Sequence, residues 1–451
     1  MKRAAGRAGR SVGRGVLSAC LVGLALRLAF VAGLPTEPFS DFAAYFENAK
    51  QLARAGNMHG LPAMHPPGYP LVLVPFLAMT PSAAWLVVAK VVKCLLGAWT
   101  VFLGARLARR LWGGRVAILA AWFLALYPRL LVQPSLIASE NLFTPLLFVF
   151  VALLADAFRE ENAVPRAAAS GAAVGALALT RALTYYIPLV WVAASLAGGR
   201  KPRRVARDLL VLLVVQHAIL LPWALRNRED LGRFTFLTTS SGMALFNGNN
   251  DNATGGWYPW MADLVRLRPE VAGQPATVVD EVARQEAIRW IRAHPRRAFG
   301  LYFRKLWMIV EQDALAPQWA TAAPPGRADS GGSLLLRHRG VVVVAVRIAA
   351  AVFGVLGLVG GLLLLRGLTG SPAERAATIG FLGTMAFIPA VSAWIAVNGR
   401  YRWPVEDLLL ILAAWTLASA VSTWTAGRTR APVAVAGAEA QYSGRRDPGG
   451  D

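Results

Sequence analysis

The feature that most constrains this chain is a series of long apolar runs. Examples are residues 16–34, 136–158, 208–225, 340–365 and 404–424, each near the roughly 20 residues with which a helix crosses a bilayer. Backbone N–H and C=O groups find no water in hydrocarbon, so such runs form helices that satisfy these groups internally. Only 16% of the 451 residues are charged, whereas a soluble protein has about a quarter. The sequence therefore predicts an all-α polytopic membrane protein.

The basic residues indicate how the chain is oriented. The chain carries 47 Lys and Arg residues against 25 Asp and Glu residues, a net charge of +22. These basic residues cluster in short links beside the spans, as the positive-inside rule expects of cytoplasmic loops. We therefore predict that these basic residues lie next to a lipid bilayer and do not bind nucleic acid. The main clusters are residues 2–14, 106–115, 200–207 and 428–446.

The runs predict a bundle of about ten to eleven transmembrane helices with interfacial helices. We place ten spans, at 16–34, 83–105, 116–132, 138–158, 166–181, 183–198, 206–225, 340–365, 376–397 and 404–424. A further apolar segment, 67–80, is short for a span and is more typical of a re-entrant or interfacial piece. If it crossed, the basic link 106–115 would lie outside, which the charge rule opposes. Eleven crossings remain the alternative.

This layout divides the chain into five parts. We expect a basic cytoplasmic N-terminus (1–15), a transmembrane catalytic module (16–225) with an outer loop (35–82), a periplasmic loop region (226–339), C-terminal transmembrane helices (340–424) and a disordered cytoplasmic tail (425–451). The outer segments are expected to hold helices at 41–56, 278–294 and 296–312, the last along the membrane. The second outer segment is also expected to contain a turn-rich run at 246–257 and a Gly/Ser/Pro-rich link at 323–333.

Ionisable residues converge on the predicted outer ends of the spans, where such residues tend to be functional. They are Asp41, Glu140, Arg181, Arg226, Arg400 and Arg402. A carboxylate can take a proton from an acceptor hydroxyl, and arginine pairs with phosphate through two parallel hydrogen bonds. This set predicts transfer of a group from a membrane-anchored phosphate carrier. No GxxxxGK[ST] phosphate loop is present, which argues against ATP or GTP.

Simpler interpretations of the same residues remain open. Ser40-Asp41 and Ser139-Glu140 precede helices and could serve as helix N-caps or meet the helix dipole. Each arginine could extend its side chain to lipid headgroups. His65, in the string MHPPGYP, could contact a phosphate or belong only to a turn. The other histidines match no metal spacing and are expected to be structural: His59, His217, His294 and His338.

An ordered series of short motifs carries a resemblance to a known family. The motifs are SDFAAY, HPPGYPL, SENLFTPLLF, LALTRAL, PWALRNRE, LFNGNN and GRYRWPV. From about residue 20 to 424 the chain resembles the GT-C membrane glycosyltransferases, close to the protein mannosyltransferase and lipid A aminoarabinose transferase group. Where some relatives have a Glu-Lys pair before the prolines, this chain has Met64 and His65. We also expect no large periplasmic domain after the last span.

The resemblance implies roles for particular residues. The family uses polyprenyl-phosphate sugars on the non-cytoplasmic face, with a first-loop aspartate, here Asp41, as catalytic base and a second site carboxylate, here Glu140. The resemblance places the donor phosphate at the Arg-Tyr-Arg turn of residues 400–402. We assign to donor phosphate binding Arg181, Arg226, Arg400, Tyr401, Arg402 and His65. We assign to the substrate pocket Tyr45, Tyr69, Asn247 and Asn249.

The sequence thus predicts a membrane glycosyltransferase that moves a sugar from a polyprenyl-phosphate donor to an acceptor hydroxyl, with inversion. The acceptor is left open among lipid, glycan and protein. Composition rich in Arg, Ala and Gly favours a bacterial cytoplasmic membrane, with the site facing the periplasm. No metal site is predicted and no cofactor is certain, although a divalent cation is left open. The alternative function is a transporter or flippase for a lipid-linked glycan, which needs polar residues deep inside several spans.

Overall fold

The structure, a computed structural model, describes residues 2–157, 163–312, 314–321 and 334–429. Throughout these residues the regular structure is helical, and an isolated bridge between Gly256 and Val397 is their sole β pairing. The prediction of an all-α polytopic membrane protein is confirmed. Each predicted span coincides with helical structure, although 116–132 and 183–198 each cover two helical elements.

Seven helical stretches of the described residues are long and apolar enough to cross a membrane: Arg10–Gly33, Ser82–Trp112, Glu140–Ala157, Pro202–Leu231, Arg339–Thr369, Pro372–Ser392 and Gly399–Thr423. The pair Gly114–Leu126 and Pro128–Ser135, bent by 55°, adds an eighth if it counts as one span. The two other predicted spans, 166–181 and 183–198, coincide with α8 (Val164–Thr180) and the short apolar stretch Ala182–Ala197. By length and composition the described residues therefore supply seven or eight crossings, and the predicted ten are reached only if these two shorter stretches also cross.

The segment 67–80 forms a short helix, α3 (Gly68–Ala78), of 11 residues. At 1.5 Å per residue it is roughly 17 Å long, about half the hydrocarbon thickness. It packs against α2 (Ser40–Ala55) and α4 (Trp85–Trp112). Its length fits the re-entrant or interfacial interpretation and leaves the eleven-span alternative without a helix long enough to cross.

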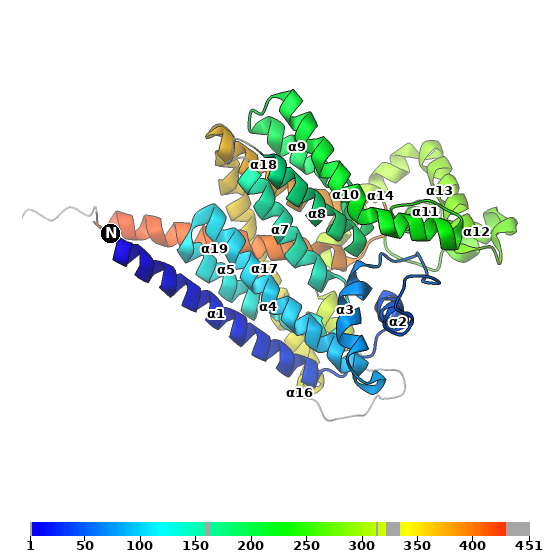
Figure 1. Ribbon diagram of the computed structural model, residues 1–451, viewed down its shortest axis with the longest axis horizontal. Coiled ribbons are helices and arrows are strands. Elements are labelled where there is room, and N and C mark those ends of the chain that lie inside the picture. The colour runs from blue at the N-terminus through cyan, green and yellow to red at the C-terminus, as the bar shows by residue number, and fades with distance from the viewer. Residues whose placement is uncertain (1, 158–162, 313, 322–333, 430–451) are drawn as a thin grey trace, which may run out of the picture.

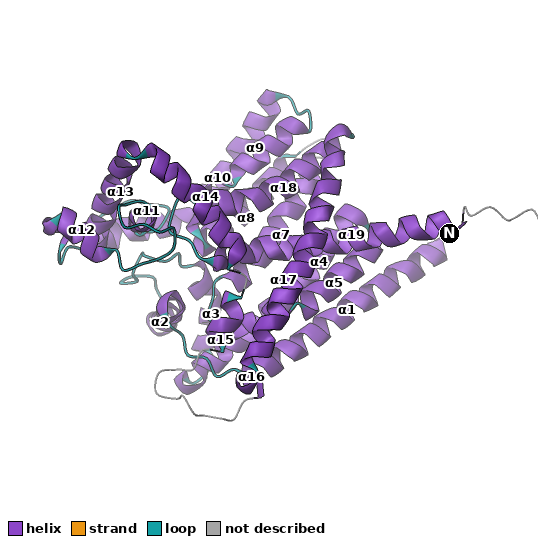
Figure 2. Ribbon diagram, turned by 180° about the vertical axis from the view of Figure 1, so that it is seen from behind, coloured by secondary structure: helices purple, strands orange, loops and turns teal. Residues whose placement is uncertain are grey.

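The long helices lie side by side, and the predicted outer segments gather at one end of them. Figure 1 shows α1 (Lys2–Gly33), α4, α5 (Gly114–Leu126), α7 (Glu140–Ala157) and α19 (Trp403–Thr429) in one bundle. At the end far from the N-terminus lie α2, α3, α11 (Ser241–Gly248), α12 (Met261–Leu267) and α13 (Ala276–Ala293), and Figure 2 shows the same arrangement from behind. Residues from both outer segments are thereby placed close to the ends of the spans.

The remaining helices complete the bundle and its rim. They are α6 (Pro128–Val132), α9 (Pro188–Ala197), α10 (Pro202–Leu231), α14 (Pro295–Glu311), α15 (Leu315–Ala320), α16 (Leu334–Arg337), α17 (Arg339–Leu364) and α18 (Pro372–Ser392). The 3₁₀ turn η6 (Gly399–Arg402) precedes α19. The expected outer helices are observed as α2, α13 and α14. On α14, large apolar side chains at helical spacing are exposed, at Phe299, Phe303, Trp307 and Val310, as expected of a helix that lies along a membrane surface.

Some predicted boundaries were wrong in detail. The run 246–257 was expected to be loop, but Phe246, Asn247 and Gly248 form the end of α11 because Ser241–Gly248 is continuous helix. Helix α1 already begins at Lys2 and α19 continues to Thr429. The basic N-terminus is therefore helical, and the start of the predicted tail is too. The link 323–333 and the tail from residue 430 lie outside the described residues.

A buried arginine stabilises the bend between α5 and α6. Pro128 has no N–H, so the carbonyl of Leu124, four residues earlier, lacks its helical donor. Arg27 of α1, which is fully buried, donates from Nη2 to the Leu124 oxygen at 2.8 Å and from Nη1 to the Ala125 oxygen at 3.3 Å. A Cβ on Gly97 of α4 would lie 2.6 Å from Arg27 Nε. Glycine at this position leaves room for the guanidinium.

Candidate active site

Asp41 lies in the first turn of α2, at the end of the bundle that carries the outer segments. The preceding residue, Ser40, has φ of 49°, a left-handed conformation that is uncommon outside glycine and is often found at functional sites. The helix N-cap is Phe39, and no side chain caps it. The N-cap interpretation of Asp41 is therefore wrong. Its carboxylate instead accepts from Arg400 Nη2 at 3.0 Å and lies 3.3 Å from His65 Nε2.

Arg400 is held in place by the turn that precedes α19. The side chain of Asn398 accepts from the backbone N–H of Arg400 at 3.0 Å and caps η6. The N–H of Gly399 donates to the side chain of Gln312, just past α14, at 2.9 Å. A Cβ on Gly399 would collide with the carbonyl oxygen of Gln312. The sequence Asn-Gly-Arg thus fixes the turn closely against the residue that follows α14, and the Arg400 side chain is directed into the site.

Glu140 is the first residue of α7 and is fully buried. This is the position that the helix-start interpretation expected, where the helix dipole favours a carboxylate. Its Oε1 pairs with Arg400 Nε at 2.9 Å and also with Arg181 Nη1. Its Oε2 has no hydrogen-bond partner among the described residues. Glu140 is therefore both a helix-start residue and a member of the charged cluster.

Arg181 enters this cluster because α8 ends at Thr180. Arg181 itself is extended, with φ of −147° and ψ of 112°, and its side chain lies 5.0 Å from the ring centre of Tyr401. Helix α3 approaches the end of α8 closely, since a Cβ on Gly68 would lie 2.6 Å from the carbonyl oxygen of Leu179. The Gly of HPPGYPL therefore permits the packing that brings α3 beside Arg181.

Two tyrosines of the predicted substrate pocket lie next to His65. The ring of Tyr45 is 5.1 Å from the His65 ring and 5.7 Å from the Tyr69 ring. Beyond them lies Lys93, fully buried in α4, whose Nζ is 5.6 Å from the Tyr69 ring centre and donates to the carbonyl of Ala138 at 3.0 Å. Lys93 was missed as a site residue. A lysine inside an apolar run was the available signal, because charges in spans tend to be functional.

Exposure and charge distinguish Asp41 within the cluster. Its side chain is 42% exposed, whereas those of Arg400 and Glu140 are 9% and 0% exposed. Burial alone would raise the pKa of the Asp41 carboxyl. The hydrogen bond with His65 and the charge of Arg400 outweigh burial, and the pKa lies well below its ordinary value. An ionised, partly exposed carboxylate thus lies beside the buried guanidinium of Arg400.

Two predicted arginines do not join this cluster. Arg402 pairs through Nη2 with Glu406 at 2.7 Å and donates from Nη1 to the Val310 carbonyl. Arg226 donates to the carbonyl of Met58 at 2.9 Å and pairs with Asp230 at 3.0 Å. Neither side chain is free to extend to lipid headgroups. Both join separate segments of the chain.

The two predicted asparagines of the substrate pocket hold the loop after α11. Asn247 accepts from the N–H of Tyr258 at 3.3 Å. Asn249 donates to the carbonyl of Trp394 at 2.7 Å and accepts from the buried Lys305 at 3.3 Å. The structure therefore places them in contacts that join α11, α14 and the end of α18. It does not bring them to Asp41.

A second charged network, which the sequence analysis missed, lies deeper in the bundle. Arg129 of α6 is fully buried and donates to Glu406 at 2.6 Å and to Asp407. Asp407 also accepts from Thr144 of α7 at 2.8 Å. The adjacent acids at 406–407, within an otherwise apolar run, were the available signal. They indicate a buried partner because an unpaired charge in hydrocarbon is costly.

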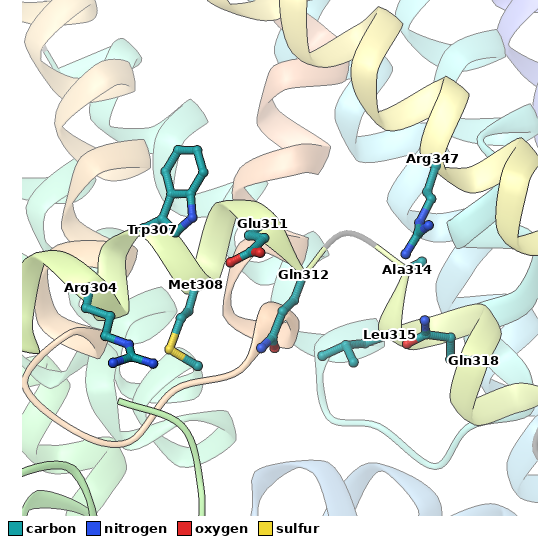
Figure 3. A pocket seen from close by; sticks show the side chains of 9 residues that line it. All are labelled: Arg304, Trp307, Met308, Glu311, Gln312, Ala314, Leu315, Gln318 and Arg347. Carbon is teal, nitrogen blue, oxygen red and sulfur yellow. The ribbon is translucent and has the colours of Figure 1, made fainter. Parts of the chain in front are cut away.

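A cavity of about 530 Å³ lies beside the cluster, between α14, α15 and α17 (Figure 3). Its walls include Arg304, Gln312, Gln318 and Arg347. Gln312 is shared between this cavity and the turn that holds Arg400. Asp41, Glu140 and Arg400 themselves do not line the cavity. No group of three His, Cys, Asp or Glu residues that could hold a metal ion occurs among the described residues.

No protein-family model matches the sequence, and no curated protein matches it either. Solved structures do match. The archaeal oligosaccharyltransferase AglB from Archaeoglobus fulgidus, in complex with an inhibitory peptide and a dolichol-phosphate, matches with a TM-score of 0.53 at 14% identity, over 96% of this chain and 52% of that chain. An oligosaccharyltransferase structure from the same organism, in complex with Zn and sulfate, gives a TM-score of 0.51 at 14% identity, over 91% of this chain and 49% of that chain.

ArnT from Cupriavidus metallidurans, bound to undecaprenyl phosphate, matches with a TM-score of 0.42 at 15% identity, over 92% of this chain and 79% of that chain. The chain spans about half the length of the oligosaccharyltransferase that it matches. At such identities the likeness concerns the fold alone.

Proposed function

We propose that this chain, whose fold is that of the GT-C membrane glycosyltransferases, transfers a sugar from a polyprenyl-phosphate donor to an acceptor hydroxyl. The reaction inverts the anomeric centre and takes place on the outer face of a bacterial cytoplasmic membrane. The acceptor is a hydroxyl of a lipid, a glycan or a protein.

The observation that carries this proposal is the meeting of Asp41, Glu140, Arg181 and Arg400 from four separate helical elements. They come from α2, α7, the end of α8 and η6, at residues as far apart as 41 and 400. Maintaining buried charges near a membrane is costly. A cluster with one exposed carboxylate and two arginines has the groups needed to activate a hydroxyl and to bind a phosphate.

The chemistry follows from these groups. Asp41 takes the proton of the acceptor hydroxyl while its oxygen attacks the anomeric carbon. The bond from that carbon to the phosphate oxygen breaks on the opposite face, and the electron pair stays on the phosphate. Arg400 and Arg181 neutralise the charge that develops there, since a guanidinium stays charged and pairs with phosphate through two hydrogen bonds. Asp41 then loses the proton to water.

The resting pairing of Asp41 suits it to act only when the donor is bound. With Arg400 at 3.0 Å and His65 at 3.3 Å, the carboxylate is a weak base because its pKa lies below the ordinary value. A donor phosphate attracts the same guanidinium. As Arg400 shifts toward that phosphate, Asp41 loses a counter-charge and its basicity rises.

The flippase alternative receives less support from the intramembrane charges. A flippase needs polar groups that face a path through the bilayer. Arg27 and Lys93 instead donate to backbone carbonyls, and Arg129 is paired with two carboxylates. All three side chains are buried among helices, with exposures of 0%. These three charged side chains therefore connect neighbouring helices and do not line a path through the bilayer.

The test is transfer by the purified chain in lipid nanodiscs, supplied with polyprenyl-phosphate sugars and envelope extracts as acceptor. We expect sugar to appear on an acceptor, detected by mass spectrometry, and to be lost in Asp41→Asn. The matched assay uses sealed vesicles with labelled donor and no acceptor. Movement of the intact donor across the vesicle membrane, without transfer in the first assay, would support the flippase instead.

A further inference from the structure

We infer that Arg400 is the resident cation of this site and occupies the place between Asp41 and Glu140 that a divalent metal would take. The inference concerns the cation requirement of the proposed transfer, and its role in catalysis rests on the proposed function. A solved structure with the same fold holds Zn and sulfate, which raises the question whether the residues of this chain fit a metal.

The geometry of Arg400 is that of a bridge between two carboxylates. Its Nη2 lies 3.0 Å from Asp41 Oδ2 and its Nε lies 2.9 Å from Glu140 Oε1. Two nitrogens of one guanidinium therefore meet two carboxylates that come from α2 and α7, Nη2 through a hydrogen bond and Nε through a close ion contact without hydrogen-bond geometry. A divalent cation that bound both carboxylates would have to lie in the same place. The side chain of Arg400 is only 9% exposed, so solvent does not readily displace it.

Few oxygen atoms are left for a metal. Asp41 Oδ1 is already engaged with His65 at 3.3 Å, and Glu140 Oε1 also meets Arg181. Glu140 Oε2 is the carboxylate oxygen of the cluster that lacks a hydrogen-bond partner among the described residues. Calcium takes about six to eight oxygen ligands, and magnesium demands a nearly complete octahedron. One such oxygen, without a group of three potential ligands in the described chain, does not fit either ion.

The charge balance of the cluster also argues against a bound divalent cation. Asp41 and Glu140 contribute two negative charges, and Arg400 and Arg181 contribute two positive charges. A divalent cation would add two more positive charges to a largely buried site with no new anion to balance them. A donor phosphate would bring negative charge to the same arginines. The residues therefore fit an anion and do not fit a metal ion.

The experiment measures cation binding directly and does not depend on turnover. The full chain is stripped with EDTA in nanodiscs and titrated with Mn²⁺, and bound Mn²⁺ is followed by electron paramagnetic resonance. We expect wild-type protein to show no saturable site that Asp41→Asn removes. We expect Arg400→Ala to gain one saturable Mn²⁺ site, and the double variant Arg400→Ala/Asp41→Asn to lose it again.

The matched control is Arg402→Ala, two residues away in the same turn, whose partner is Glu406. It should gain no site that depends on Asp41. If Arg400→Ala does not fold, Arg400→Gln and the wild-type titration carry the test. Wild-type protein that binds one Mn²⁺ lost in Asp41→Asn would overturn the inference. A folded Arg400→Ala or Arg400→Gln protein that binds no Mn²⁺ would also overturn it, because the carboxylates would then not form a cation site.

The second arm measures transfer with EDTA and with added Mn²⁺. We expect wild-type transfer to be unchanged by either. Loss of transfer in EDTA, with recovery in Mn²⁺, contradicts the inference. A chain that transfers no sugar under any condition contradicts the proposed function, while the Mn²⁺ titration still decides on Arg400.

Discussion

Two buried arginine–carboxylate networks lie near each other in this molecule and differ in how far their carboxylates are exposed. In the first, Arg400 joins Glu140 to Asp41, and the Asp41 side chain is 42% exposed. In the second, Arg129 joins Glu406 to Asp407, and these three side chains are 0%, 6% and 0% exposed. The first network opens to the outside at its carboxylate, and the second is closed.

This difference in exposure distinguishes a network that a substrate can reach from a network that only connects helices. In the closed network Asp407 is also bonded to Thr144, and none of the three side chains is more than 6% exposed, so no substrate can reach them. In the open network Asp41 is reachable, and a fully buried oxygen of Glu140 lacks a hydrogen bond. A buried polar group without a partner costs stability. Glu406 Oε1 in the closed network also lacks a hydrogen bond, so the two networks differ in the access that solvent and substrate have to Asp41. Variants in the two networks should therefore fail differently.

The largest effect is expected from Asp41→Asn. The substitution keeps the size of the side chain and removes its basicity, so transfer should fall by about 10²- to 10⁴-fold, the usual scale for a general base. Folding should change only modestly, because Asp41 does not cap α2 and its side chain is 42% exposed, so loss of its ion pair with Arg400 costs less than loss of a fully buried one. The measurement is the transfer rate and a thermal melt on the same purified sample. Normal transfer with a normal melt would remove Asp41 from the mechanism.

The counterpart in the closed network is Asp407→Asn. It leaves the buried Arg129 with Glu406 as its one remaining carboxylate. Removing one partner of a buried ion pair costs roughly 3–5 kcal/mol, so the variant should unfold at a distinctly lower temperature. Transfer per folded molecule should stay within a few-fold of wild type. A variant that melts normally and transfers no sugar would mean that the closed network takes part in the reaction.

Next in size is the contrast between Arg400→Lys and Arg402→Lys. The lysine at 400 keeps the charge but cannot meet two carboxylates or a phosphate with a planar fork. Losing one charge-assisted hydrogen bond costs roughly 1.5–3 kcal/mol, which corresponds to a loss of transfer of about ten- to a hundredfold. Arg402→Lys should keep most of its transfer, because Arg402 pairs with Glu406. Equal losses in the two variants would show that the whole turn acts on the donor.

The smallest effect concerns pH. The pKa of Asp41 is held below its ordinary value by His65 and Arg400, against burial. The stability that this provides is present above the unfolded pKa, about 4, and is lost only as pH falls through the lower folded pKa. When both proteins carry His65→Gln, so that no imidazole next to position 41 titrates, melts with and without Asp41→Asn should therefore run parallel from pH 8 to 5. A stability difference that grows within this window would show that Asp41 is not ionised as described.

Much of the fold could be predicted from the sequence because hydrocarbon imposes one rule on the backbone. Apolar runs must be helices, and the predicted spans coincide with helices. The lengths of α8 and of Ala182–Ala197 were less predictable, since Arg181 interrupts their apolar pattern. The bend at Pro128 was missed because a proline in a span can be accommodated by neighbouring helices.

The site was predicted in part. Asp41, Glu140, Arg181 and Arg400 carry charge at span ends, which the sequence displays, and the structure brings them together. Their pairing could not be predicted, because side chains 359 residues apart meet only through tertiary packing. Arg400 and Arg402 looked equivalent in the sequence. A short turn places them in different networks, so tertiary packing decides which of the two meets Asp41.

The arginine at position 27 has a consequence for how this protein is made. The carbonyls that accept its hydrogen bonds lie as much as 98 residues later in the chain. At about 5–20 residues per second, synthesis delivers them roughly five to twenty seconds after Arg27 itself. During that interval the first helix carries a charge without these acceptors, which costs about 2.5–3.5 kcal/mol at the bilayer centre on insertion scales. Until α5 has been made, Arg27 has only the Gly23 carbonyl of its own helix among its carbonyl acceptors, so the contact that stabilises the bend at Pro128 forms late in synthesis.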